Sequence, residues 1–290
     1  MTREPYLERL ARRSAAVGNV LCLGLDPDPA EIPPALGSGV AGAERFARLV
    51  LEAGLPVAAA VKANLAFFEA FGSAGIAALE RLRAAVPPAV PFIADAKRGD
   101  IGSTAARQAV ALFGALDADA VTVNPYLGGA AIGPLLERPD RFAYVLCRTS
   151  NEGAGELQDL FVAAGGGVGE PIWARVARAA SGWGPGATVG LVVGATAPGE
   201  LAAARSLAPG LAFLVPGVGA QGGAVDPVLA AGRAIAPPAG GRPGGGLLVN
   251  VSRAIARAAL EPDEGRPAGD LGERVASAAT RWAAMLPVLP

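Results

Sequence analysis

The sequence contains no histidine, and this absence excludes several kinds of active site at once. A Ser-His-Asp triad, a histidine general base and a histidine-ligated metal site all require the imidazole ring. Acid–base chemistry in this chain must therefore rely on Lys, Asp, Glu, Tyr or Cys.

Cysteine is almost as scarce, since Cys22 and Cys147 are the only two in the chain. Each stands within an apolar run typical of a strand, and neither their number nor their spacing indicates a disulfide framework or a metal site. We expect both to be small, buried side chains.

Neither sign of charge is in excess, with 25 Lys and Arg against 26 Asp and Glu. This balance gives no indication of binding to nucleic acid or to a membrane surface. No apolar run free of Gly, Pro and charge approaches the roughly 18 residues of a membrane-spanning helix. The first residues lead into a charged helical pattern and show no signal peptide. We therefore expect a soluble, cytoplasmic protein.

Aliphatic residues are abundant: 52% of the 290 residues are hydrophobic, although only 5% are aromatic. An amphipathic N-terminal helix is predicted at about 5–16, and eight short apolar runs follow it, separated by helical patterns. The predicted strands are 20–25, 57–61, 90–94, 120–123, 143–147, 188–193, 211–215 and 247–251. The predicted helices are 42–53, 73–86, 103–115, 130–137, 171–181, 198–207, 225–235 and 270–285. Two Gly- and Pro-rich stretches, 152–169 and 236–246, are predicted as a long loop and a flexible connection.

Continuously apolar strands indicate burial on both faces and hence a parallel sheet. Eight strand–helix units in this length predict an α/β fold, a TIM (β/α)8 barrel formed by residues 1–290 as a single domain. A doubly wound sheet is the main alternative. No G-x-G-x-x-G motif follows the first strand, which argues against a dinucleotide-binding protein of that kind.

Almost every predicted strand ends in a polar side chain that could take part in chemistry. In TIM barrels the carboxyl ends of the strands carry the active site. Each of these residues alone could be an incidental polar group at a strand end, but the whole set on one face indicates a site. They are Asp26, Lys62, Asp95, Lys97, Asn124, Ser150, Gln221 and Arg253.

Residues 92–104 (FIADAKRGDIGST) hold the densest group of charges at these strand ends. Because residues i and i+2 of a strand point to the same side, Asp95 and Lys97 are expected to project together, with Asp100 returning from the next loop. The ordinary interpretation is a salt bridge before a helix cap. With Lys62 facing them across the barrel, they would instead form a Lys-Asp-Lys-Asp array in which each charge supports the others.

The loops after the last two strands have the features of a phosphate site. Glycines in 217–223 allow backbone N–H groups to approach a phosphate closely, and Arg253 can donate two hydrogen bonds to phosphate oxygens. A Gly-rich turn beside a surface arginine is the simpler interpretation of each piece. Both lie where TIM barrels commonly bind phosphate, so we expect a phosphate group there.

These motifs together resemble the orotidine 5′-phosphate decarboxylase family, over about residues 18–258. The matching segments are 23–27 (LGLDP), Lys62 with Asn64, 95–101 (DAKRGDI), 216–223 and Arg253. The residues at 96–104 (AKRGDIGST) and 124–126 (NPY) are similar to those of the longer bacterial branch of the family. One departure is Ser252, where many relatives have glycine before the arginine.

The resemblance implies decarboxylation of orotidine 5′-phosphate to UMP, the last step of de novo pyrimidine synthesis, without metal or cofactor. It implies that Asp95 lies against the substrate carboxylate and that Lys97 protonates C6 of the pyrimidine. It also implies that Lys62 belongs to the charged array, and that Asp100 and Thr104 reach the active site of a neighbouring subunit in a homodimer.

The remaining residues are implied in substrate binding: Asp26 with Lys62 on the ribose, Ser150 on the pyrimidine edge, and Gln221 between base and phosphate. Arg253 is expected on the phosphate. Asn124 and Pro216 are expected to belong to the same site.

Two rival functions remain open on the sequence. A sugar-phosphate decarboxylase or aldolase of the same superfamily shares the Asp-x-Lys-x-x-Asp motif but uses Mg²⁺, held in part by a Glu on the second strand. Here that strand carries Lys62, a cation that would repel a metal ion. The other rival is a non-catalytic barrel that binds a nucleotide phosphate, and an intact charged array argues against it.

Overall fold

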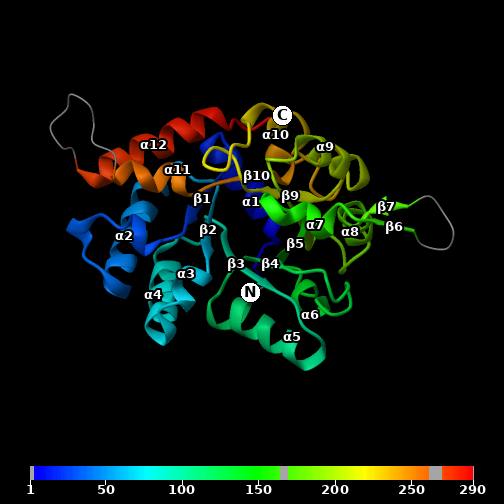
Figure 1. Ribbon diagram of the computed structural model, residues 1–290, viewed down its shortest axis with the longest axis horizontal. Coiled ribbons are helices and arrows are strands. Elements are labelled where there is room, and N and C mark those ends of the chain that lie inside the picture. Colours follow the sequence, from blue (N-terminus) through cyan, green and yellow to red (C-terminus); the bar gives the residue numbers. More distant parts are fainter. Residues whose placement is uncertain (1–2, 164–168, 261–269, 290) are drawn as a thin grey trace.

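The computed structural model describes residues 3–163, 169–260 and 270–289. Eight parallel strands close into a barrel in the order β1-β10-β9-β8-β5-β4-β3-β2, with helices around it (Figure 1). The strands are β1 (Leu21–Leu25), β2 (Ala60–Asn64), β3 (Phe92–Arg98), β4 (Ala120–Val123), β5 (Phe142–Arg148), β8 (Val189–Val193), β9 (Ala212–Val215) and β10 (Leu248–Val251). The predicted TIM barrel is confirmed.

The helices follow the strands in the alternation that the sequence predicts. The longer ones are α1 (Tyr6–Val17), α2 (Gly39–Gly54), α4 (Gly72–Ala85), α5 (Gly102–Ala109), α8 (Ile172–Ala180), α9 (Pro198–Leu207), α10 (Val225–Ala231) and α12 (Leu271–Met285). Four short α-helices are also described: α3 (Ala66–Glu69), α6 (Gly133–Leu136), α7 (Gly155–Gln158) and α11 (Arg253–Ala256). A π-helix at Val110–Ala115 continues α5. Within the described residues, no helix has the length and apolar character needed to cross a membrane.

The hydrophobic core has two parts. The larger part lies between the strands and the surrounding helices, and the smaller part fills the inside of the barrel. Tyr6, Leu7 and Leu10 of α1 belong to the smaller part, which also contains Tyr144 of β5. Helix α1 therefore closes the amino-terminal end of the barrel, and only the opposite end is left for a site.

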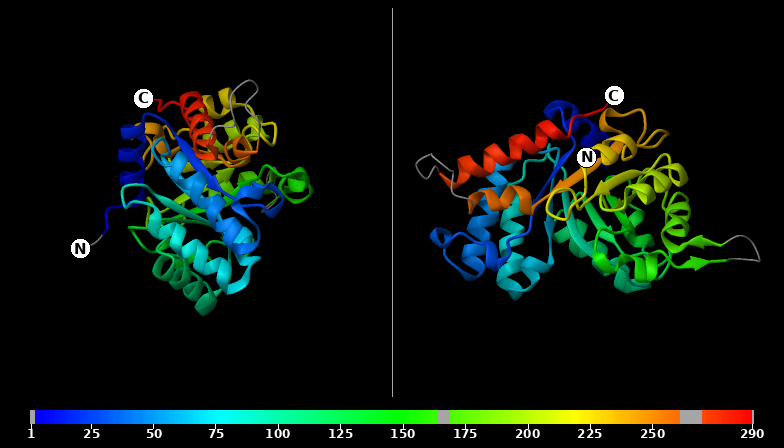
Figure 2. Two further views of the ribbon diagram at one scale, coloured as in Figure 1. Left: turned by 90° about the vertical axis from the view of Figure 1, so that its left-hand side faces the viewer. Right: turned by 45° about the horizontal axis from the view of Figure 1, so that its top comes forward.

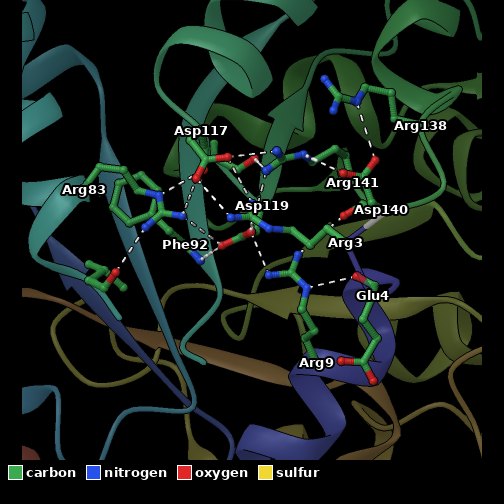
Figure 3. Close-up of polar contacts among 12 residues, drawn as sticks. Arg3, Glu4, Arg9, Arg83, Phe92, Asp117, Asp119, Arg138, Asp140 and Arg141 are labelled. Carbon is green, nitrogen blue, oxygen red and sulfur yellow. Dashed lines mark hydrogen bonds and ion pairs between the residues drawn. The ribbon is translucent and has the colours of Figure 1, made fainter. Parts of the chain in front are cut away.

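A cluster of charged side chains lies at this closed end and ties α1 to the strands (Figure 3). We call it the base cluster, and it comprises Asp117, Asp119, Arg3, Arg9, Arg83 and Arg141. Asp119 is almost fully buried: it accepts hydrogen bonds from Arg9 at 2.7 Å, from Arg3 at 3.0 Å and from the Phe92 amide at 2.8 Å. Every carboxylate oxygen of Asp117 and Asp119 thus has at least one donor.

Two predicted loops are more ordered than the sequence indicates. Part of 152–169 forms α7 and a short antiparallel pair, β6 (Phe161–Val162) with β7 (Glu170–Pro171), which projects from the barrel (Figures 1 and 2). Residues 164–168 lie outside the described residues. In 236–246, Ala239 is fully buried and its amide donates to the Gly210 carbonyl, so the expected flexible connection is packed against the barrel.

Candidate active site

A cavity of about 470 Å³ opens at the carboxyl ends of the strands, a size within the usual range of small-molecule sites. Most of the side chains that the sequence placed in a site line this cavity. They are Asp26, Lys62, Asp95, Lys97, Ser150, Pro216, Gln221 and Arg253. The barrel brings them together from six of its eight strands or from the loops that follow those strands.

Three alternating charges form the centre of the site, and we call Lys62, Asp95 and Lys97 the mouth cluster. Lys62 Nζ lies 2.7 Å from Asp95 Oδ2, and Lys97 Nζ lies 2.7 Å from Asp95 Oδ1. The side chains of Lys62 and Asp95 are 5% and 11% exposed, whereas that of Lys97 is 49% exposed. Lys97 is therefore the member of the cluster that a ligand in the cavity can reach most easily.

Each charge of the mouth cluster stabilises its neighbours. Burial alone would raise the pKa of Asp95, but the charges of Lys62 and Lys97 outweigh burial and hold it well below its usual range. Burial would likewise lower the pKa of Lys62, but Asp95 and Asp26 outweigh that effect and raise it. Asp95 and Lys62 therefore stay charged at neutral pH despite their burial.

The backbone of β3 is irregular where it carries Lys97. Lys97 has a left-handed backbone with φ of 48°, unusual for a residue other than glycine. The pairing with β4 shifts between Ala94 and Arg98, so three residues of β3 stand opposite Thr122 alone. Asp95 and Lys97 do point to the same side, as predicted, but through this β-bulge and not through a regular strand.

Thr122 of β4 contacts both residues of the irregular segment. Its hydroxyl donates to Asp95 Oδ1 at 2.8 Å and accepts from the Lys97 amide at 2.9 Å. The Thr122 residue is 2% exposed and lines the floor of the cavity. Thr122 could not be selected from the sequence, because a single threonine in an apolar strand carries no distinctive pattern.

Ser252 and Arg253 mark the end of the cavity where a phosphate was expected. Arg253 is the first residue of α11, directly after β10, and Ser252 precedes it. A Cβ on Gly24 would lie 2.5 Å from the Ser252 Cβ, so β1 needs glycine at this point. The absence of a side chain at Gly24 makes room for the Ser252 side chain.

The loop after β9 lies beside these residues and folds upon itself. The Gly223 amide donates to the Gly217 carbonyl at 3.0 Å, and the Gly222 amide donates to the Gly219 carbonyl at 2.8 Å. Gly217 has a φ of 98°, and a Cβ there would lie 2.9 Å from both Ser150 Cβ and Gln221 Oε1. Glycine at this point lets Ser150 and Gln221 approach each other at the cavity wall.

The segment after β5 is held by a side chain that was not predicted. Gln158, at the end of α7, accepts a hydrogen bond from the Thr149 amide at 2.9 Å and donates to the Thr149 hydroxyl at 2.8 Å. Both residues line the cavity with Ser150. The turn of helix within the expected loop 152–169 thus fixes the backbone next to Ser150.

Three predicted site residues do not line the cavity of their own chain: Asp100, Thr104 and Asn124. Thr104 and Asn124 are exposed. The Asp100 carboxylate accepts from the Ile101 amide at 2.8 Å, and the Asn124 side chain accepts from the Tyr126 amide at 3.0 Å. Asp100 and Asn124 lie in the β3–α5 and β4–α6 connections, and Thr104 lies in the first turn of α5.

Two buried acceptors in the cavity are unpaired. Among the described residues, neither Asp26 Oδ1 nor Asn250 Oδ1 has a hydrogen-bond partner. Asn250 is 9% exposed and lies on β10, three residues before Arg253. Since buried acceptors are normally paired, these two oxygens indicate where a bound molecule can supply donors.

The chemistry of the lining favours an anionic, hydroxylated ligand. Two ammonium groups and a guanidinium group face the cavity together with the amide and hydroxyl groups around Ser150. Within residues 3–163, 169–260 and 270–289, no three acidic or Cys side chains are grouped so that they could hold a metal ion. The arrangement can hold a phosphate at one side and stabilise negative charge near Lys97 at the other.

Comparison with known proteins points to one family. The model of the Orotidine 5'-phosphate decarboxylase / HUMPS family matches residues 19–266. An orotidine 5'-phosphate decarboxylase of Thermomicrobium roseum is 46% identical over 253 residues, or 86% of each chain. One of a Roseiflexus species is 45% identical over 236 residues, covering 81% of this chain and 82% of the relative. The solved structure of Leishmania donovani OMP decarboxylase has a TM-score of 0.79 and 36% identity, covering 97% of both chains.

Proposed function

The chain belongs to the orotidine 5′-phosphate decarboxylase family, and we propose that its mouth cluster performs the reaction of that family. The enzyme is a carboxy-lyase that converts orotidine 5′-phosphate to UMP and CO2, as the sequence predicted. The observation that carries the assignment of residues is the contact of Asp95 with two ammonium groups at 2.7 Å.

Lys97 is the proton donor in this proposal. Breaking the bond between C6 and the carboxylate leaves an electron pair on C6, with no adjacent group to delocalise it. An ammonium group already in place stabilises that charge and then delivers its proton to C6. Lys97 is half exposed to the cavity and fixed by Asp95, so it can meet C6 without leaving the array. Solvent restores its proton after the product departs.

Asp95 and Lys62 hold that ammonium in place. Asp95 lies next to the substrate carboxylate, and the two negative charges repel each other. The product no longer carries that carboxylate, so the repulsion is relieved by the reaction. Lys62, paired with Asp95 at 2.7 Å, keeps this carboxylate charged and also reaches a ribose hydroxyl.

The remaining lining residues bind the parts of the substrate that do not react. Arg253 and the backbone around Ser252 hold the phosphate, and Gln221 bridges phosphate and base from the loop after Pro216. Ser150 contacts the pyrimidine edge. The unpaired Oδ1 of Asp26 accepts from a ribose hydroxyl. Binding energy from the phosphate can then support closure of the loop and alignment of the base.

A second copy of the chain completes the site in this proposal. Thr104 is exposed and Asp100 is partly exposed near Ile101, which is 65% exposed. Tyr126 and Leu127, in the β4–α6 connection, are 78% and 53% exposed. Large exposed apolar side chains beside functional groups favour a protein interface, so Asp100 and Thr104 are placed to enter the partner's cavity. Asn124 belongs to the same surface.

The cytoplasmic location of the protein remains a prediction.

The decisive experiment follows the absorbance of orotidine 5′-phosphate with time. We expect wild type to bleach the substrate, with and without EDTA, and Lys97→Ala to lose at least about 10³-fold in kcat. If wild type binds the nucleotide but releases no CO2, the enzymatic function is wrong. If Lys97→Ala keeps most of its kcat, only the assignment of the proton donor is wrong.

The shared site has a separate test that uses mixed dimers. Lys97→Ala and Asp100→Asn are each expected to be nearly inactive. A 1:1 mixture, denatured and refolded together, gives mixed dimers in which one site keeps both native residues. About a quarter of wild-type activity should return, because half of the dimers are mixed and each has one intact site. No recovery beyond the sum of the two variants would mean that Asp100 does not act across an interface.

A further inference from the structure

Lys97 occupies a backbone conformation that its side chain does not favour. A positive φ of 48° brings the Cβ of a non-glycine residue close to its own backbone. Such a conformation persists only where surrounding contacts hold it. The β-bulge also separates the Lys97 amide from the regular ladder, since β3 pairs with β4 through Ala94 and Arg98 on either side.

Thr122 provides the contacts that hold it. The Thr122 hydroxyl accepts from the Lys97 amide at 2.9 Å and so replaces the ladder partner that the bulge removes. The same hydroxyl donates to Asp95 Oδ1 at 2.8 Å. One oxygen atom therefore fixes both the backbone of Lys97 and the carboxylate to which the Lys97 ammonium binds.

A packing role alone does not explain a threonine at this position. The other residues of β4, Ala120, Val121 and Val123, are apolar and fully buried. Valine has nearly the same shape as threonine and would fill the same space without a hydroxyl to satisfy. Thr122 uses its hydroxyl both as donor and as acceptor, and both partners belong to the mouth cluster.

We propose that Thr122 is a positioning residue of the reaction: its hydroxyl, held between Asp95 Oδ1 and the Lys97 amide, sets the left-handed turn from which the Lys97 ammonium meets C6. Thr122 acts through Lys97 and Asp95 and needs no contact with the substrate. This inference rests on the proposed role of Lys97 as proton donor.

Removal of the hydroxyl should affect the reacting group more than the binding of the nucleotide. In the proposed function, phosphate and base are held by Arg253, Ser150 and Gln221, and none of these is hydrogen-bonded to Thr122 within the part of the chain that the structure describes. A proton donor displaced by about 1 Å can slow a reaction by roughly 10²-fold. The expected signature is therefore a lower kcat with a nearly constant KM.

The test compares Thr122→Val with Thr122→Ser, using orotidine 5′-phosphate as substrate and UMP as the binding probe. We expect Thr122→Val to lose roughly 10- to 100-fold in kcat, with KM and UMP affinity within about threefold of wild type. Thr122→Ser keeps the hydroxyl and should retain most of kcat. The matched control is Thr188→Val, since Thr188 is also buried and its hydroxyl has no partner among the described residues; its kcat should equal that of wild type.

Several results would overturn the proposal. To separate loss of the hydroxyl from loss of the fold, exchange of the Lys97 amide hydrogen is measured in both variants, and it should remain protected in Thr122→Ser. Equal loss of kcat in Thr122→Val and Thr122→Ser would show that the hydroxyl is not responsible. A kcat for Thr122→Val within twofold of wild type, beside an inactive Lys97→Ala, would reject the role of Thr122 while leaving that of Lys97 intact. An inactive wild type would instead reject the proposed function itself.

Discussion

The two ends of the barrel each hold a cluster of charged side chains, and the clusters differ in whether an open cavity lies beside them. In the base cluster, every carboxylate oxygen of Asp117 and Asp119 has a donor (Figure 3). At the mouth, Asp95 is fully paired, but the neighbouring Asp26 Oδ1 has no partner among the described residues. Lys97 is also half exposed to an open cavity.

We infer from this difference that the base cluster stabilises the structure and that the mouth cluster binds a ligand. The base cluster uses arginines, whose planar groups donate to carboxylates and to backbone carbonyls at once, as Arg83 and Arg141 do. The mouth cluster uses lysines, compact charges that can give up a proton. We therefore expect changes at the base to alter stability and changes at the mouth to alter the rate.

The largest expected effect on stability comes from Asp119→Asn. The change removes the buried anion that compensates Arg9, whose side chain is 5% exposed, and breaking such a buried pair costs about 3–5 kcal/mol. Urea unfolding should show this loss, while kcat of the folded fraction stays within about twofold of wild type. Asp26→Asn is the matched change at the mouth and should lose activity with little loss of stability. Loss of activity in Asp119→Asn together with loss of stability in Asp26→Asn would contradict these different roles of the two ends of the barrel.

Acid should reveal a second difference between the clusters. Although burial opposes it, Lys62 and Lys97 hold the pKa of Asp95 well below its usual range. A carboxyl with a lowered pKa in the folded state stabilises the protein above its unfolded pKa of about 3.9 and loses that contribution as the pH falls further. The free energy of unfolding then falls by about 1.4 kcal/mol per pH unit, over the pH range in which only the unfolded chain takes up the proton.

Variants test this dependence by unfolding at a series of pH values below 5. We expect the free energy of unfolding of Asp95→Asn to depend less steeply on pH than that of wild type, because the contribution of Asp95 is missing. The pKa of Asp117 is also lowered, against burial, by its hydrogen bonds with Arg3 and Arg141. Its side chain is 44% exposed, however, so Asp117→Asn should change the slope less. Equal slopes in wild type and Asp95→Asn would contradict the expectation.

A smaller effect is expected from Gln158→Ala at the mouth. The variant loses two hydrogen bonds to Thr149, each contributing about 0.5–1.5 kcal/mol, and Ser150 next to it becomes less well placed. We expect KM for orotidine 5′-phosphate to rise roughly tenfold, with kcat changed by less than about threefold. Glu156→Ala, on the exposed side of the same helical turn, is the control and should behave as wild type. An unchanged KM in Gln158→Ala would mean that this turn only covers the barrel.

The smallest effect is expected from Arg3→Ala at the rim of the base cluster. The side chains of Arg3 and Asp117 are 29% and 44% exposed, and ion pairs in contact with water contribute about 1 kcal/mol or less. Asp119, the second partner of Arg3, keeps its ion pair with Arg9 in this variant. The melting temperature should fall by no more than about 2–4 °C, with unchanged activity. Arg12→Ala removes a still more exposed pair with Glu4 and should give no measurable shift. A loss as large as that of Asp119→Asn would show that Arg3 is a central member of the cluster.

The fold and the mouth of the barrel could be predicted because both depend on local patterns. Apolar runs mark buried strands, and a polar residue at the end of each run marks the face that carries the site. The predicted strand 57–61 ended before Lys62, but β2 extends from Ala60 to Asn64, because the cavity side of a barrel strand accepts polar residues. The shift leaves Lys62 at the same end of the barrel.

The contacts between strands could not be predicted in the same way. Thr122 meets Lys97 only because β3 is bulged against β4, and no local pattern in either strand indicates the bulge. The base cluster was missed for a similar reason. Arg3, Arg83 and Asp119 are far apart in sequence and look like ordinary surface charges until α1 closes the barrel.

The bulged turn at Lys97 bears on the transfer of this chemistry to other scaffolds. A protein engineer who copies Asp-x-Lys onto the end of a regular parallel strand would reproduce the residues but not the left-handed turn. The transplant would also need the hydroxyl of Thr122 on the next strand and the extra residues that create the bulge. The smallest segment that would reproduce the geometry in another protein is therefore the pair of neighbouring strands β3 and β4, and not the Asp-x-Lys motif by itself.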